Sequence, residues 1–149
     1  MVVKASQRLI DIADALPLTT GMRVLEIGCG PGVLARLIAE RMKGDVRVLG
    51  IDRSASAIAA ATAQMTGSAH PTAIAFRQVA AEHFMLAEEE EPFDLAVAIR
   101  VGALDGRHPE VGRLVLPRIR AALRPGGRIF IDGGNPLREI PLTGLPDQQ

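Results

Sequence analysis

The segment Val24-Leu25-Glu26-Ile27-Gly28-Cys29-Gly30-Pro31-Gly32 joins an apolar run to a turn that contains three glycines at alternate positions. A helical pattern opens immediately afterwards, at Val33. This order predicts a buried strand that ends in a tight turn and continues into a helix. Because glycine has no Cβ, a ligand can approach such a turn closely, and the N–H groups that begin the helix favour a carboxylate or a phosphate. The segment therefore predicts a binding site for a nucleotide-like cofactor.

The length and composition are typical of one globular domain that spans residues 1–149. Of the 149 residues, 48% are hydrophobic and 23% are charged, which predicts a folded chain with a continuous core. The 17 basic residues are balanced by 17 acidic ones, so no long-range field gathers nucleic acid or anionic lipid. We therefore expect neither of these partners.

The sequence also predicts where the protein is located and whether it binds a metal. The single cysteine, Cys29, excludes an internal disulfide, and there is no Cys/His cluster with zinc spacing, so we expect no metal site. No apolar run approaches the roughly 18 residues that a membrane span requires. These features predict a cytoplasmic protein that is neither exported nor inserted in a membrane.

Apolar periodicity predicts five strands that alternate with helices. Each connection between strands is longer than a dozen residues, as parallel strands require, so the expected fold is α/β, with a doubly wound, mostly parallel sheet covered on both faces. The predicted strands are 22–28, 46–51, 73–79, 93–99 and 128–132, and the predicted helices are 4–16 (within an N-terminal segment 1–20), 33–42, 54–65, a short one within 83–91, and one that begins at Pro109.

Three segments leave details of this fold open. Pro117 falls inside the last helix, which either kinks there or splits into two short helices. The acidic run Glu88-Glu89-Glu90-Glu91 predicts a solvated surface loop, because like charges in a row repel one another. Residues 133–149 predict a short irregular tail rich in glycine and proline, with room for one more strand near Leu137–Leu142. The sheet is therefore expected to have five or six strands.

A second acidic residue narrows the identity of the cofactor. A dinucleotide site would place a small residue where Val33 stands, whereas the third glycine here is Gly32. Asp52 ends the second predicted strand, 24 positions after Gly28, where its carboxylate can accept hydrogen bonds from both hydroxyls of a ribose. Two structural alternatives stay open: a generic strand-to-helix turn at the glycines, and an Asp52 that only caps the helix at Ser54.

Four segments together are similar to the motifs of one family. They are the stretch Val24–Gly32, Gly50-Ile51-Asp52, Phe93-Asp94-Leu95, and Leu123-Arg124-Pro125-Gly126-Gly127. In this order, over about residues 20–132, the chain resembles the class I S-adenosylmethionine-dependent methyltransferases. The resemblance implies a Rossmann-like methyltransferase fold, S-adenosylmethionine as the cofactor and S-adenosylhomocysteine as its product.

The resemblance also implies roles for individual residues. Glu26 meets the amino group of the methionine part of the cofactor, directly or through water, and Asp52 holds the ribose. Ile51 and Arg53 flank the adenine. Ala80 stands where many members have an aspartate that binds the adenine amino group, so the adenine relies on the backbone of Ala81 and on Glu82 or His83. The full set expected to bind the cofactor is Glu26, Gly28, Cys29, Gly30, Gly32, Asp52, Arg53, Ala81, Glu82 and Arg100.

The methyl acceptor is expected beyond the carboxyl ends of the fourth and fifth strands. His108 and Asp132 are the first candidates for catalytic residues there, with a surface histidine and a strand-end turn carboxylate as the alternatives. Arg100 either binds a carboxylate or phosphate of the substrate or forms an ordinary salt bridge. Further residues within reach are Asp105, Arg107 and Asn135.

The predicted function is in-line methyl transfer to a small molecule. The segment Ile99-Arg100-Val101-Gly102 lacks the Asn/Asp-Pro-Pro-aromatic signature of enzymes that methylate amino groups of nucleic acids. The alternative function is that of a catalytically inactive accessory or regulatory subunit that binds S-adenosylmethionine. Binding of a nicotinamide cofactor is the third and weakest alternative. About 17 residues follow the fifth strand, which predicts a shortened or missing C-terminal hairpin, an exposed sheet edge and hence a homodimer.

Overall fold

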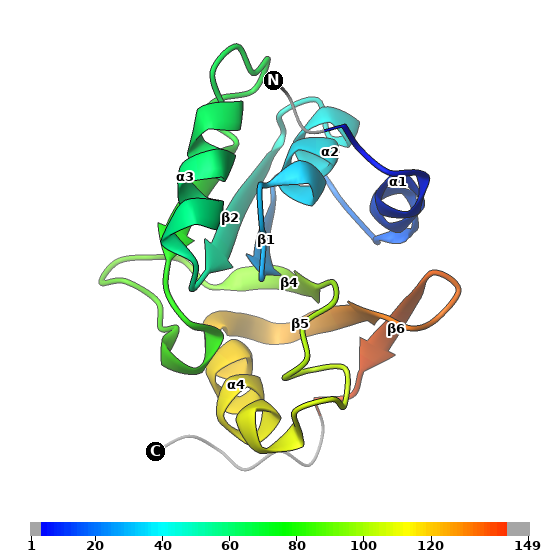
Figure 1. The fold of residues 1–149 in the computed structure, drawn as a ribbon, viewed down its shortest axis with the longest axis vertical. Coiled ribbons are helices and arrows are strands. Elements are labelled where there is room, and N and C mark those ends of the chain that lie inside the picture. The colour runs from blue at the N-terminus through cyan, green and yellow to red at the C-terminus, as the bar shows by residue number, and fades with distance from the viewer. Residues whose placement is uncertain (1–3, 143–149) are drawn as a thin grey trace.

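A six-stranded sheet forms the centre of the protein in the computed structural model, which describes residues 4–142 (Figure 1). The strand order is β3-β2-β1-β4-β5-β6, in which β1 to β5 are parallel and β6 pairs antiparallel with β5. This confirms the predicted doubly wound, mostly parallel α/β fold. The strands are β1 Met22–Ile27, β2 Val46–Asp52, β3 Ile74–Gln78, β4 Phe93–Ala98, β5 Leu123–Asp132 and β6 Leu137–Ile140.

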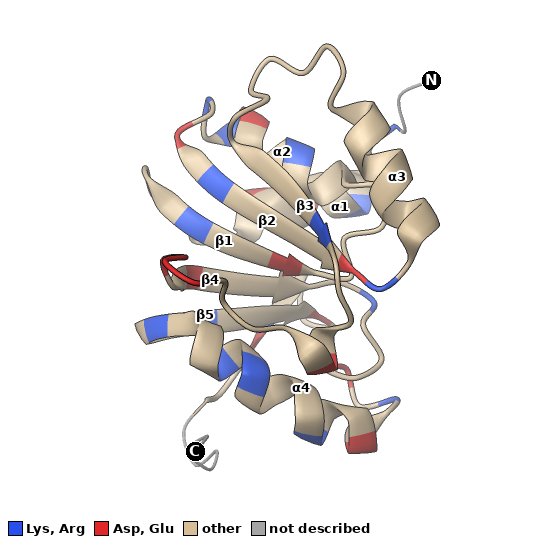
Figure 2. Cartoon of the chain, turned by 90° about the vertical axis from the view of Figure 1, so that its left-hand side faces the viewer, with Lys and Arg blue, Asp and Glu red and all other residues tan. Residues whose placement is uncertain are grey.

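Helices cover both faces of this sheet. The helices α1 Gln7–Ala15, α2 Val33–Arg41 and α3 Ala55–Gln64 lie on one face. The helix α4 Pro109–Ala122 lies on the other, beside the short 3₁₀ turn η1 Ala81–His83 (Figures 1 and 2). Side chains of β1 alternate between the two cores: Val24 packs with α1 and α2, and Leu25 packs with α4. Buried parallel strands are apolar on both faces for this reason.

Local sequence signals set where the helices begin. The Ser6 hydroxyl accepts a hydrogen bond from the Leu9 amide (3.2 Å) and caps α1. In α1, Ile12 and Ala13 are buried. The Ser54 hydroxyl caps α3 in the same way, accepting from the Ala57 amide (3.1 Å). The Ser54 cap begins α3 directly after β2, which ends at Asp52.

The prediction of a helix within residues 83–91 is wrong. Only the 3₁₀ turn η1 forms here, because Phe84 and Leu86 both pack against the core, and a spacing of two residues suits an extended segment rather than a helix. The acidic run is also more than a solvated loop. Glu90 accepts two hydrogen bonds from the Arg77 guanidinium (3.2 and 2.8 Å) and one from the Ala87 amide (2.9 Å). The hydrogen bonds from Arg77 lower the pKa of Glu90, while its neighbours Glu88 and Glu89 are exposed.

The C-terminal third of the described chain is more regular than the sequence predicts. One continuous helix passes through Pro117, and Arg113, whose carbonyl loses its partner to the proline, is exposed to solvent. The strand β5 begins at Leu123 rather than 128, because Leu123 already pairs with Phe93 before a register shift. The strand β6 confirms the extra strand near 137–142, so residues 133–142 are not simply irregular; residues 143–149 of the predicted tail lie outside the described part.

Candidate functional site

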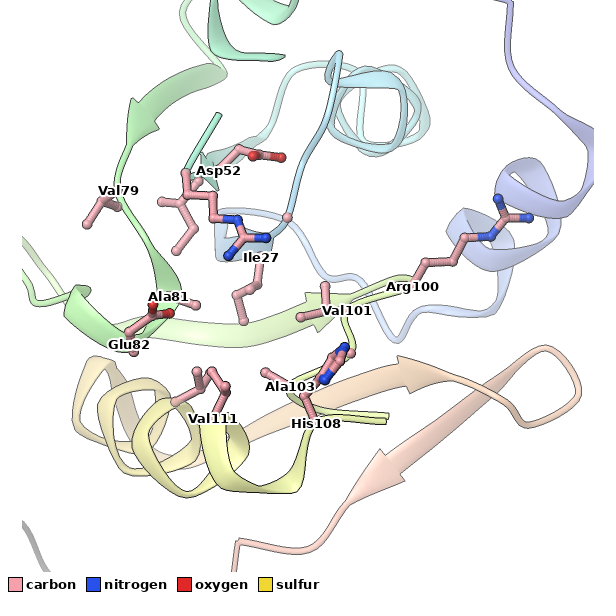
Figure 3. A pocket seen from close by; sticks show the side chains of 15 residues that line it. Ile27, Asp52, Val79, Ala81, Glu82, Arg100, Val101, Ala103, His108 and Val111 are labelled. Carbon is pink, nitrogen blue, oxygen red and sulfur yellow. The ribbon is translucent and has the colours of Figure 1, made fainter. Parts of the chain in front are cut away.

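A cavity of about 490 Å³ opens at the carboxyl ends of β1, β2 and β4 (Figure 3). It lies where β1 has β2 on one side and β4 on the other, which is the point at which ligands bind in open α/β sheets. Figure 3 shows Glu82 and Ala81 at one end of the cavity and His108 and Val101 at the other. The lining residues are Ile27, Gly28, Ile51, Asp52, Arg53, Val79, Ala81, Glu82, Arg100, Val101, Gly102, Ala103, His108, Val111 and Val115.

The glycine turn, residues Gly28–Gly32, joins β1 to α2 at the floor of this cavity. Gly28 has a φ of +67°, and a Cβ there would lie 2.9 Å from Cγ2 of Val101. Gly32 has a φ of +82°, and a Cβ there would lie 2.7 Å from Cζ of Phe76. Both positions therefore need glycine for two reasons, a left-handed backbone and a neighbour in close contact.

We predict that Gly32→Ala destabilises the protein by about 2 kcal/mol, because the left-handed φ and the overlap with Phe76 both oppose a methyl group. Urea unfolding measures this loss. Gly67→Ala is the matched control: its φ is +81°, but a Cβ there meets nothing within 4 Å. An equal loss in both variants would show that the contact with Phe76 contributes nothing.

Glu26 is a buried carboxyl group in β1, two residues before the glycine turn. It is 4% exposed, and burial raises its pKa to about 8, helped by the negative charge of Asp52 and opposed by a backbone hydrogen bond from Ala35. Within the described residues its Oε1 atom has no hydrogen-bond partner. A buried acceptor without a donor costs about 1–3 kcal/mol. A cationic or N–H group of a ligand on the turn would satisfy this atom.

Asp52 ends β2 and fixes the other side of the turn. Its Oδ2 atom accepts a hydrogen bond from the Gly30 amide (3.0 Å), and its Oδ1 atom accepts one from the Ser54 amide (2.9 Å). The carboxylate therefore supports the start of α3, as the structural alternative held, and lines the cavity as well. Two carboxylate oxygens offer about four lone pairs, so acceptor capacity is left for two hydroxyl groups.

Six of the ten residues expected to bind the cofactor line the cavity: Gly28, Asp52, Arg53, Ala81, Glu82 and Arg100. The other four are not lining residues: Glu26 belongs to β1, and Cys29, Gly30 and Gly32 belong to the glycine turn. The Cys29 thiol is 5% exposed, and burial raises its pKa to about 12, so it is a packed, protonated group rather than a contact for a ligand. Its backbone amide donates to Ile51 (3.0 Å), which ties the turn to β2.

The two candidate catalytic residues have different surroundings. His108 lines the cavity, and its imidazole lies against Gly102, where a Cβ would be 2.4 Å from Cδ2. Asp132 is not a lining residue. Its Oδ1 atom accepts a hydrogen bond from the Arg100 amide (3.0 Å) and its Oδ2 atom pairs with Arg8 (2.5 Å). Both carboxylate oxygens of Asp132 therefore have partners within the described chain.

Arg100 contributes to the wall mainly through its backbone. Its φ is +59°, and in Figure 3 its guanidinium extends away from the rest of the cavity toward α1. Of the other residues considered, Asp105 pairs with Arg107 (2.8 Å), and His83 does not line the cavity.

Sequence reasoning missed the apolar wall opposite the glycine turn. Val101 and Ala103 come from the segment after β4, and Val111 and Val115 from α4. The spacing of the two valines by four residues places them on one helix face, and this signal was available in the sequence. The partnership of Asp132 with Arg8 was also missed, because the two residues are 124 positions apart.

Residues 4–142 contain neither a candidate metal site nor a helix that could span a membrane. No three side chains of His, Cys, Asp or Glu come together there in a way that would hold a metal ion. None of the helices in this range is long and apolar enough to cross a membrane.

Comparisons with known proteins agree with this geometry. The family model of a methyltransferase domain matches residues 18–146. A ubiquinone biosynthesis O-methyltransferase of Rhizobium etli is 36% identical over 121 residues, which are 81% of this chain and 44% of that protein. A trans-aconitate 2-methyltransferase of Methylobacterium nodulans is 30% identical over 87% of this chain and 45% of that protein.

Solved structures share the fold. A methyltransferase from Geobacter sulfurreducens, described as S-adenosylmethionine-dependent and solved with S-adenosylhomocysteine, superposes with a TM-score of 0.67 at 24% identity, over 85% of this chain and 47% of that one. The cyclopropane synthase MmaA2 of Mycobacterium tuberculosis gives 0.67 at 28% identity, over 82% and 40%. This chain spans less than half the length of these relatives. Its match to the family model covers most of its own residues, and the chain belongs to the methyltransferase-domain family.

Proposed function

We propose that this chain binds S-adenosylmethionine and catalyses in-line transfer of its methyl group to a small molecule. The observation that carries this proposal is the buried Glu26 oxygen that has no partner among residues 4–142, two residues before the glycine turn, with Asp52 at the end of the neighbouring strand. Membership of the methyltransferase-domain family and the solved relative with S-adenosylhomocysteine support it. The cavity volume also falls within the roughly 300–1,000 Å³ of small-molecule sites.

The ammonium, ribose and adenine parts of the cofactor can each be assigned to particular residues of this chain. Glu26 would receive the ammonium group, and the remaining lone pairs of Asp52 would accept the two ribose hydroxyls. Ala81 and Glu82 stand at the end expected to hold the adenine, and Arg53 also lines the cavity. When bound, S-adenosylmethionine supplies a methyl group on a positively charged sulfur.

The rest of the cavity would promote the reaction by alignment and by excluding water. Val101, Val111 and Val115 form an apolar wall, which favours a transfer in which positive charge disperses. Holding two reactants in line contributes effective molarities of about 10⁵ M or more. His108 is the lining residue able to take a proton from an acceptor that arrives protonated.

Calorimetry with S-adenosylmethionine, S-adenosylhomocysteine and NAD tests the cofactor. We expect micromolar binding of both adenosyl compounds and none of the dinucleotide. Binding of NAD alone would overturn the proposal. A screen of small acceptors for release of S-adenosylhomocysteine then tests turnover, and tight binding with no release for any acceptor would favour the inactive accessory subunit.

We also propose that the protein is a cytoplasmic homodimer. The strand β6 pairs with β5 on one side and ends the sheet on the other, so its free edge offers backbone groups to a second copy. A buried free cysteine suits a reducing compartment. Sedimentation at micromolar concentration tests the dimer, and a monomer alone would refute it.

A further inference from the structure

Asp132, the last residue of β5, joins two distant parts of the chain at the edge of the cavity. Its side chain is 12% exposed. The Oδ1 atom accepts a hydrogen bond from the Arg100 amide at 3.0 Å, and the Oδ2 atom pairs with the Arg8 guanidinium of α1 at 2.5 Å. Because one carboxylate makes both bonds, the position of α1 and the position of Arg100 depend on each other.

Arg100 begins a hydrogen-bonded loop, residues 100–108, between β4 and α4. Its φ of +59° is a left-handed conformation that an arginine adopts only where its surroundings hold it. The Val101 carbonyl then accepts from the amides of Leu104 and Asp105 (both 3.0 Å), and the Gly102 carbonyl accepts from the His108 amide (2.9 Å). The loop is therefore one unit, and the bond to Asp132 fixes its first residue.

The same loop forms the wall opposite the glycine turn. Arg100, Val101, Gly102 and Ala103 all line the cavity. Val101 approaches the turn so closely that a Cβ on Gly28 would lie 2.9 Å from its Cγ2 atom. A shift of Arg100 would therefore move Val101 and change the width of the cavity beside Gly28.

We propose that Asp132 is a positioning residue that couples the docking of α1 to the shape of the 100–108 loop, and through Val101 to the width of the cavity. This inference rests on the proposed function, because it assigns the positioned wall to the cofactor site. Asp132 touches neither cofactor nor acceptor in this role; it acts through the Arg100 amide.

The chain contains a matched control for the α1 side of this link. Asp14 of α1 pairs with Arg41 of α2, also at 2.5 Å, and this pair is exposed like Arg8. Ile12 and Ala13 anchor α1 by burial, so removal of either ion pair leaves the helix docked. Removing Arg8 breaks the link to the loop, whereas removing Asp14 breaks an ion pair of the same length that does not reach the loop.

The test compares Arg8→Ala, Asp132→Asn, Asp132→Ala and Asp14→Ala by two measurements, calorimetric affinity for S-adenosylhomocysteine and hydrogen exchange of the 100–108 amides. We expect about a tenfold loss of affinity in Asp132→Ala, which loses both bonds. Arg8→Ala and Asp132→Asn should each lose about threefold, since the asparagine oxygen still accepts from Arg100. Loop exchange should rise in the same order, and Asp14→Ala should match the unmodified protein in both measurements.

Three outcomes would overturn the inference. They are unchanged loop exchange in Arg8→Ala, an Asp132→Asn variant as impaired as Asp132→Ala, and an effect of Asp14→Ala on the loop equal to that of Arg8→Ala. Failure of the unmodified protein to bind S-adenosylhomocysteine would instead refute the proposed function, and loop exchange would still decide whether Asp132 couples α1 to the loop. Arg8 is 44% exposed, so its replacement keeps the test valid if Asp132→Ala does not fold.

Discussion

Replacing Asp52 with alanine is expected to weaken the binding of S-adenosylhomocysteine about 100-fold. The variant loses two acceptor oxygens for the ribose, and each hydrogen bond to a charged group contributes about 1.5–3 kcal/mol. It also frees the Gly30 and Ser54 amides, which the carboxylate now holds at 3.0 and 2.9 Å. Calorimetry at constant pH measures the loss.

Asp45 provides the matched control for this experiment. It is an exposed carboxylate just before the opposite end of β2, so Asp45→Ala removes the same group far from the cavity. We expect its affinity to stay within a factor of two of the unmodified protein. An Asp52→Ala variant that binds as tightly as Asp45→Ala would show that the ribose is held elsewhere.

The second large effect concerns the proton on Glu26. Burial raises the pKa of this carboxyl to about 8, so at pH 7 the unliganded protein carries it mostly protonated. An ammonium group placed beside it would favour the charged form and expel the proton. We therefore expect S-adenosylhomocysteine to release close to one proton on binding at pH 7, measured by calorimetry in buffers of different ionisation enthalpy.

The affinity should follow the same titration. It rises as the pH increases toward 8, because less work is then needed to deprotonate Glu26. Glu26→Gln is the control: it should bind more weakly, release no proton through this group and lose this pH dependence. An unmodified protein that releases no proton would contradict the assignment of Glu26 to the ammonium group.

Glu26 also makes the stability of the unliganded protein depend on pH. Its pKa lies above the ordinary 4.5, so the folded state holds a proton that the unfolded chain releases between these values. The resulting contribution to the free energy of unfolding is complete below about pH 4.5 and declines as the pH rises through 8, by on the order of 5 kcal/mol. Thermal unfolding of Glu26→Gln should lack this decline.

Much of the fold and the centre of the site could be predicted from local sequence. The run Val24–Gly32 and the acidic end of the second strand indicated β1, the glycine turn and β2, because each depends on neighbours in the chain. The segment after β3 could not be predicted in this way. The bidentate pair between Arg77 and Glu90 and the burial of Phe84 are tertiary contacts, and they replaced the expected helix.

The contacts of Asp132, near the expected acceptor site, could not be predicted from local sequence either. The sequence places Asp132 at the end of a parallel strand, where a catalytic carboxylate is reasonable. Its partners Arg8 and Arg100 lie 124 and 32 residues away, and spacing gives no sign of them. Residue type and strand position therefore predicted the position of Asp132 at the end of a strand but not the partners of its side chain.

The position of β1 between β2 and β4 has a mechanical consequence. The sheet has two halves that meet between β1 and β4. The half β3-β2-β1 comes from the first 78 residues, and the half β4-β5-β6 comes from residue 93 onward. The cavity lies between these two halves. Gly28 and Asp52 line it from the first half, and Val101 and His108 line it from the second. A molecule bound there contacts both halves of the sheet. The free energy needed to separate the two halves therefore increases with the binding free energy of that molecule.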